Sequence, residues 1–102
     1  MKLETVGPLE LIPKQDSYFF SNGVYQIVLF RSGDEVYALD DTCPHASASL
    51  SKGYTDGKIV VCPWHCWEFD CKTGQGISVK GIDAEVFKVV IEDGIVKVEL
   101  PE

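Results

Sequence analysis

Two short motifs bring together the residue types that bind transition metals. The first is Cys43-Pro44-His45 and the second is Cys62-Pro63-Trp64-His65, so each places a histidine two or three positions after a cysteine. They contain the only two histidines of the chain, and the segment 46–61 separates them. Thiolate and imidazole are ligands of iron and zinc, so two loops that each carry one of both predict a metal site.

The distribution of these ligands indicates which metal the site would hold. A two-Cys, two-His zinc finger takes both cysteines from one loop and both histidines from a helix. Here each loop carries one of each kind, which suits a binuclear iron–sulfur cluster with both cysteines on one iron and both histidines on the other. The ligands would then be Cys43, Cys62, His45 and His65. A mononuclear zinc knuckle made by the same loops is the alternative.

The motifs resemble those of the Rieske ferredoxin family. The resemblance extends from about Val24 to the C-terminus, and its core is the segments Cys43–Gly53 (CPHASASLSKG) and Cys62–Gly74 (CPWHCWEFDCKTG). It implies one [2Fe–2S] cluster per chain, held by the four ligands named above, and no catalytic residue. It also implies that the histidine-bound iron is the one that changes oxidation state.

The resemblance also bears on the reduction potential. High-potential members of the family carry a disulfide between the two loops, at positions that correspond here to Ala48 and Trp64, and hydroxyl groups where this chain has Trp67 and Phe69. Fewer hydrogen bonds to sulfur stabilise the reduced cluster less, so we predict a low potential, near about −150 mV. We expect Trp64, which lies between two ligands, to shield the cluster.

The two remaining cysteines leave several interpretations open. Cys66 stands where relatives usually have glycine, so its side chain could strain the loop or place a thiol near the cluster. Cys66 and Cys71 together could form a redox switch, or they could join Cys43 and Cys62 in an all-cysteine cluster that leaves both histidines unexplained. The more common role of such residues is that of small buried hydrophobic side chains.

Size and charge narrow the function further. The chain has 102 residues, of which 45% are hydrophobic, enough for one domain with a modest core. The net charge of −7 argues against nucleic acid as a partner, because a polyanion would be repelled. No apolar run approaches the roughly 20 residues of a membrane helix, and the N-terminus lacks the apolar core of a signal peptide. We therefore expect a cytoplasmic protein with no membrane partner.

Many short apolar segments separated by Gly, Asn and Asp turns predict an all-β fold. The expected strands are Leu3–Val6, Tyr18–Phe20, Val24–Arg31, Glu35–Leu39, Lys58–Val61, Trp67–Asp70, Glu85–Ile91 and Ile95–Leu100. We expect Gly7-Pro8 to end the first strand. The prediction is a single domain over residues 1–102, an antiparallel β-sandwich with a small cluster-binding subdomain inserted at about residues 42–70. The family resemblance implies the same arrangement.

These features predict a one-electron carrier and not an enzyme, because the chain has no room for a flavin, nicotinamide or oxygenase domain. The resemblance implies that a flavin-dependent reductase supplies the electron and that a terminal oxygenase or reductase receives it. The small subunit of an NAD(P)H nitrite reductase is an alternative of similar size. A zinc-stabilised protein-binding module is the alternative from a different class.

Overall fold

The computed structural model describes residues 2–44, 48–64, 66–78 and 81–101. The strands in these ranges are β1 (Lys2–Pro8), β2 (Ser17–Ser21), β3 (Gln26–Ser32), β4 (Glu35–Asp40), β5 (Tyr54–Thr55), β6 (Ile59–Val61), β7 (Glu68–Asp70), β8 (Val86–Glu92) and β9 (Ile95–Leu100). Two 3₁₀ helices, η1 (Leu9–Leu11) and η2 (Leu50–Lys52), complete them. The helices of the described part of the chain are too short to cross a membrane. The predicted all-β class is confirmed.

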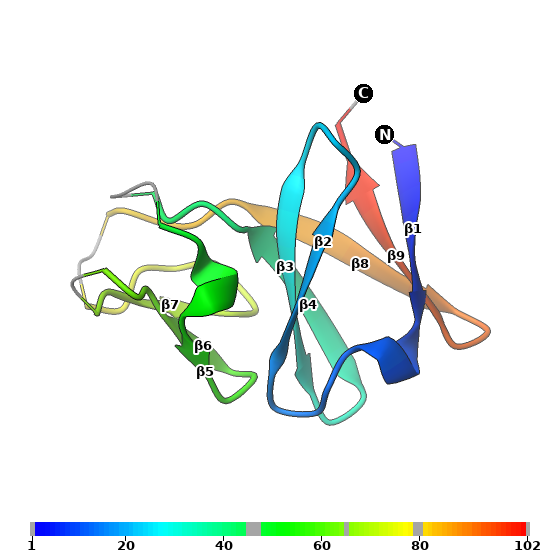
Figure 1. The fold of residues 1–102 in the computed structure, drawn as a ribbon, viewed down its shortest axis with the longest axis horizontal. Helices are drawn as coiled ribbons and strands as arrows, with labels where there is room; N and C mark the ends of the chain where they lie inside the picture. The colour runs from blue at the N-terminus through cyan, green and yellow to red at the C-terminus, as the bar shows by residue number, and fades with distance from the viewer. Residues whose placement is uncertain (1, 45–47, 65, 79–80, 102) are drawn as a thin grey trace.

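The strands form a six-stranded sheet in the order β1-β9-β8-β4-β3-β2 and a three-stranded sheet in the order β5-β6-β7. Figure 1 shows the smaller sheet to one side of the larger one, on the side away from β1 and β9. Strands β4 and β8 pair only through Ala38–Phe87 and Leu39–Val86. The larger sheet therefore consists of two three-stranded halves joined by a short link, and the smaller sheet is inserted between β4 and β8 in the sequence.

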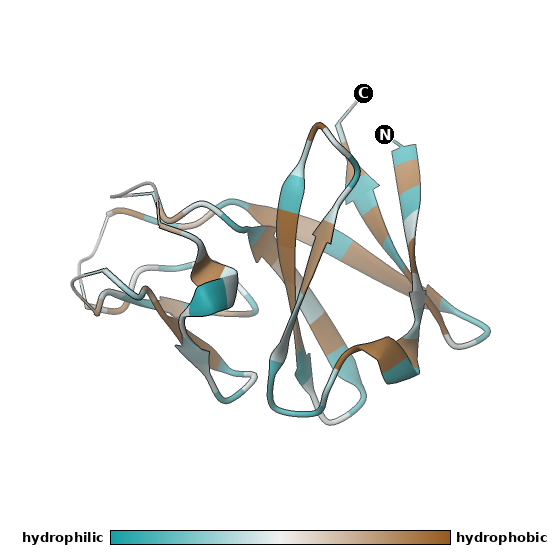
Figure 2. Ribbon diagram, viewed as in Figure 1, coloured by the Kyte–Doolittle hydropathy of each residue, from teal (hydrophilic) through white to brown (hydrophobic). Residues whose placement is uncertain are grey.

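Strand β3 is shared by the two hydrophobic cores of the molecule. Because side chains alternate along a strand, Ile27 and Leu29 face one core, and Val28 and Phe30 face the other. The first core is closed by β8 and β9, and the second contains the residues around both cysteine motifs. This double burial explains why the most apolar predicted strand has no polar face. Figure 2 shows it as a brown band in the middle of β3, whereas β9 carries alternating bands.

Strand β1 continues past the point where the sequence predicted its end. The register of its pairing with β9 shifts between Thr5 and Gly7, which marks a β-bulge, and Gly7 adopts a φ of 147°. The bulge keeps the strand paired, and Pro8 is tolerated because β1 is an edge strand. The expected break at Gly7-Pro8 was therefore wrong.

Strands β3 and β5 also differ from the predicted strands. Strand β3 begins at Gln26 and not at Val24, because the Asn22 side-chain oxygen accepts hydrogen bonds from the backbone N–H groups of Val24 and Tyr25. Such an Asx turn competes with strand pairing. Strand β5 has two residues and no alternating pattern that a sequence could reveal.

Candidate metal centre

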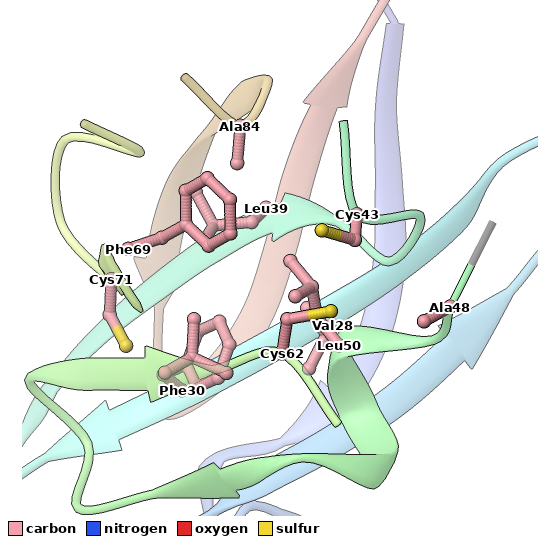
Figure 3. Close-up of a cluster of buried hydrophobic side chains, with 11 residues drawn as sticks. Val28, Phe30, Leu39, Cys43, Ala48, Leu50, Cys62, Phe69, Cys71 and Ala84 are labelled. Atoms are coloured by element: carbon pink, nitrogen blue, oxygen red, sulfur yellow. The ribbon is translucent and has the colours of Figure 1, made fainter. Parts of the chain in front are cut away.

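The structure brings the cysteines of the two motifs together. Cys43 follows β4, Cys62 follows β6, and their side chains are 2% and 0% exposed. Burial raises the pKa of the Cys62 thiol, and a hydrogen bond with the neighbouring Cys43 thiol raises it further. Figure 3 shows both side chains in the part of the hydrophobic cluster between Ala48 and the phenylalanines Phe30 and Phe69. His45 and His65 lie outside the described residues.

The two loops that begin at these cysteines are closed in the same way. The backbone N–H of Cys43 donates to the carbonyl of Ala48 at 2.9 Å, and the backbone N–H of Cys62 donates to the carbonyl of Trp67 at 2.7 Å. Each hydrogen bond joins a cysteine to the residue five positions later, so the loops have equal length. The sequence motifs therefore correspond to two matched loops, which we call the first and the second ligand loop.

A buried carboxylate holds the first ligand loop. Asp41 is 1% exposed, and its side chain accepts hydrogen bonds from the hydroxyl of Ser49 and from the backbone N–H of Ser51, the latter at 2.7 Å. Its carbonyl accepts a third one from the backbone N–H of Leu50 at 2.6 Å. Sequence reasoning missed this residue, because the Asp40-Asp41 pair before the first cysteine does not reveal which carboxylate is buried.

Gly53 lies where the two ligand loops approach each other. A Cβ atom at this position would be 1.9 Å from the carbonyl oxygen of Val61 and 3.2 Å from the Cδ atom of Pro63. Only glycine fits such a close approach of two backbones. The glycine in the segment Cys43–Gly53 was the available signal, although the sequence alone did not say which backbone it would meet.

The cysteines fit an iron–sulfur cluster. Burial favours the protonated form of a thiol, so two buried thiols ionise together only beside a metal cation. The backbone N–H of Trp64 bonds to the Cys62 sulfur and lowers its pKa, and donors of this kind stabilise cluster thiolates. No group of three possible metal ligands occurs within the described residues, which include neither histidine of the predicted set.

The two tryptophans of the second ligand loop differ in exposure. Trp64 is 56% exposed, so it does not shield the site in the way predicted from its position between two ligands. Trp67 is half-buried and packs against the hydrophobic cluster that contains both cysteines. The reason is that Trp67 leads directly into β7, whose Phe69 is fully buried, whereas Trp64 lies in the turn of the second ligand loop.

The other two cysteines differ in burial. Cys71 is fully buried and lies beyond Phe30 and Phe69 from the Cys43–Cys62 pair (Figure 3). Burial raises the pKa of its thiol to about 12. Cys66 is exposed and forms no disulfide, and its φ of 55° is the strained conformation expected where relatives have glycine. The four cysteines, all of them described, form no group of possible metal ligands, so the all-cysteine cluster was wrong. The redox switch stays a prediction, and Cys71 is a small buried side chain.

This difference predicts how the thiols react. At pH 8 a small alkylating reagent is expected to modify Cys66 in the folded, cluster-loaded protein and to leave Cys71 unmodified, because Cys71 is buried and protonated. Mass spectrometry of peptides after short labelling would measure this. Labelling in denaturant, where both thiols react, is the control. Rapid modification of Cys71 in the native protein would contradict its burial.

Comparison with known proteins defines the class. Residues 4–92 match the Rieske [2Fe-2S] domain family. The 3-phenylpropionate/cinnamic acid dioxygenase ferredoxin subunit of Escherichia coli (strain K12) is 40% identical over 78 residues, which cover 74% of each chain. In a solved complex of reduced oxygenase and oxidized ferredoxin in carbazole 1,9a-dioxygenase, one chain is 30% identical with a TM-score of 0.86, and the match covers 97% of both chains.

A further solved structure shows the same fold at lower identity. It is the putative NADH-dependent nitrite reductase small subunit of Mycobacterium tuberculosis, with a TM-score of 0.84 and 18% identity, covering 99% of this chain and 97% of the other. At this identity the likeness concerns the fold alone.

The fold and the paired cysteine loops define an iron–sulfur protein of the electron-transfer class. More narrowly, the chain belongs to the Rieske [2Fe–2S] domain family. Its cofactor is a [2Fe–2S] cluster, and its relatives are ferredoxin subunits, which are electron-transfer components and not the catalytic components of their systems.

Proposed function

We propose that the chain is the ferredoxin of a multi-component oxygenase, which takes one electron at a time from a flavin-dependent reductase and delivers it to a terminal oxygenase. The observation that carries this proposal is the buried pair of Cys43 and Cys62 on two matched loops, in a chain 40% identical to a dioxygenase ferredoxin subunit. The nitrite reductase alternative has support from the fold alone. The zinc-module alternative lacks support, because the matched family binds an iron–sulfur cluster.

The proposed ligands are Cys43 and Cys62 for one iron and His45 and His65 for the other. The cluster would supply a one-electron couple, and the protein would supply the environment. Burial keeps the two sulfur ligands away from water. Neutral imidazoles donate less charge than thiolates would, so the cluster would accept an electron more readily. The backbone hydrogen bonds that close both loops hold Cys43 and Cys62 at the start of the loops.

The surface near the ligand loops is suited to brief contact with other proteins. The segments 43–50 and 62–67 contain no charged residue, although 25% of the chain is charged, and they include the exposed Trp64. Beside the first loop, Asp40, Asp83 and Glu85 line a hollow together with Pro44. An uncharged centre with an aromatic residue and an acidic rim favours partners whose own contact surface has a basic rim.

Stepwise electron transfer tests the proposal. The purified protein, reconstituted with iron and sulfide, is expected to show visible absorption that NADH and a flavin-dependent oxygenase reductase bleach, and that a terminal oxygenase restores. Electron paramagnetic resonance of the reduced form should show the low average g value of histidine-ligated clusters. A colourless protein that binds only zinc would overturn the proposal, as would a cluster signal typical of four cysteine ligands.

The potential of this cluster is expected to be low, near about −150 mV. The positions where hydroxyl donors raise the potential of other family members hold Trp67 and Phe69 here, and Phe69 is fully buried in the hydrophobic cluster. Protein-film voltammetry at neutral pH measures the midpoint directly. A clearly positive value would contradict this prediction and leave the electron-carrier function untouched.

A further inference from the structure

The carboxylate of Asp41 is a buried charge beside the first ligand loop. Oδ2 accepts a hydrogen bond from the Ser49 hydroxyl. Oδ1 accepts one from the Ser51 backbone N–H, a group that can only donate. At 1% exposure, water does not screen this charge as it screens the other acidic residues of the surface.

No cation compensates this charge within the residues that the structure describes. The ion pairs found there join Arg31 to Asp34 and Lys97 to Glu92, and neither includes Asp41. Two hydrogen-bond donors stabilise the carboxylate, but they leave its net charge in place. A negative charge in this position is costly to bury and acts strongly on its surroundings.

We propose that the Asp41 carboxylate keeps the reduction potential of the cluster low, by placing a fixed negative charge two positions before the proposed ligand Cys43. This inference rests on the proposed ligand set. Reduction adds one negative charge to the cluster, and a fixed negative charge repels it, most strongly where the surroundings exclude water. The same side chain holds the loop through Ser49 and Ser51, so Asp41 is a positioning residue that also tunes the electron affinity.

The two roles can be separated by Asp41→Asn. An asparagine amide has nearly the same shape, its oxygen can accept from the Ser51 N–H, and its NH₂ group can donate to the Ser49 hydroxyl oxygen. The loop contacts are thereby kept while the charge is removed. Asp40→Asn is the matched control, because it removes the same charge one position earlier. The Asp40 carboxylate is half-buried and lines a hollow that is open to solvent. It accepts a hydrogen bond from the Thr42 N–H at 2.8 Å.

The measurement is the midpoint potential of each cluster-loaded variant by voltammetry, at low and high salt, together with its iron content. We expect Asp41→Asn to load the cluster normally and to shift the midpoint to more positive values at both salt concentrations. We expect Asp40→Asn to give a smaller shift that high salt suppresses, because salt screens exposed charges and not buried ones.

Three results would overturn the inference. The first is an unchanged midpoint in loaded Asp41→Asn, and the second is a shift no larger than that of Asp40→Asn. The third is failure of Asp41→Asn to load under conditions where Asp40→Asn loads, which would mean that Asp41 acts on the loop and not on the potential. A wild-type protein without a histidine-ligated cluster signal would instead overturn the proposed function, so the two failures are distinguishable.

Discussion

Replacement of Cys62 by alanine is expected to abolish cluster binding and, with it, all electron transfer. The substitution removes one of the two proposed sulfur ligands and leaves the Cys43 thiol buried, where it ionises only beside a metal cation. Metal-site affinity depends on the complete ligand set, so partial occupancy is not expected. Iron and sulfide analysis, visible absorption and reduction by NADH through a reductase would each measure the loss.

The chain supplies a matched control for this substitution. Cys71→Ala also truncates a fully buried cysteine of the same hydrophobic cluster, but Cys71 lies beyond Phe30 and Phe69 from the proposed site. It should lose about 1 kcal/mol of stability through the small cavity and should keep its full iron content. Retention of the cluster in Cys62→Ala, or its loss in Cys71→Ala, would show that the ligand assignment is wrong.

Gly53→Ala is expected to have the second large effect, a loss of about 3 kcal/mol of unfolding free energy and a marked loss of cluster. The backbone conformation of Gly53, with a φ of −86°, suits any residue, so the cost is steric. The new methyl group would meet the Val61 carbonyl oxygen at 1.9 Å. This carbonyl directly precedes Cys62, a proposed ligand, so it cannot move without displacing the second ligand loop. Chemical denaturation followed by circular dichroism, with iron analysis, would test this.

Gly33→Ala separates this steric effect from a general effect of losing a glycine. Gly33 has a φ of 63°, and no atom lies within 4 Å of the position a Cβ would take. Its replacement should cost only about 1–2 kcal/mol of conformational strain and leave the cluster content unchanged. Equal losses in the two variants would mean that the close approach at Gly53 does not decide loop assembly.

The sequence was most informative where one physical requirement decides the residue. The segment Ile95–Leu100 was predicted with its observed boundaries, because its apolar residues alternate cleanly and turn residues flank it. The two cysteine motifs predicted that Cys43 and Cys62 would meet, and the buried thiol pair confirms that they do. Chemistry of this kind depends on residue type and spacing, which a sequence displays directly.

The sequence was least informative where a role depends on neighbours that are distant along the chain. Nothing local distinguishes the buried Asp41 from the more exposed Asp40, since only the return of the chain at Ser49 and Ser51 covers one of them. The same holds for Trp64 and Trp67, whose exposures depend on which of them enters β7. The bulge of β1 was hidden for a similar reason, because its partner β9 is at the other end of the chain.

The equal closure of the two ligand loops has a consequence for the speed of electron transfer. The ring from Cys43 to Ala48 and the ring from Cys62 to Trp67 are held by backbone hydrogen bonds that are independent of the oxidation state of iron. When the cluster gains or loses an electron, the scaffold around the sulfur ligands therefore has little cause to rearrange. We therefore expect a small reorganisation energy, and with it rapid electron exchange with partners even at a modest driving force.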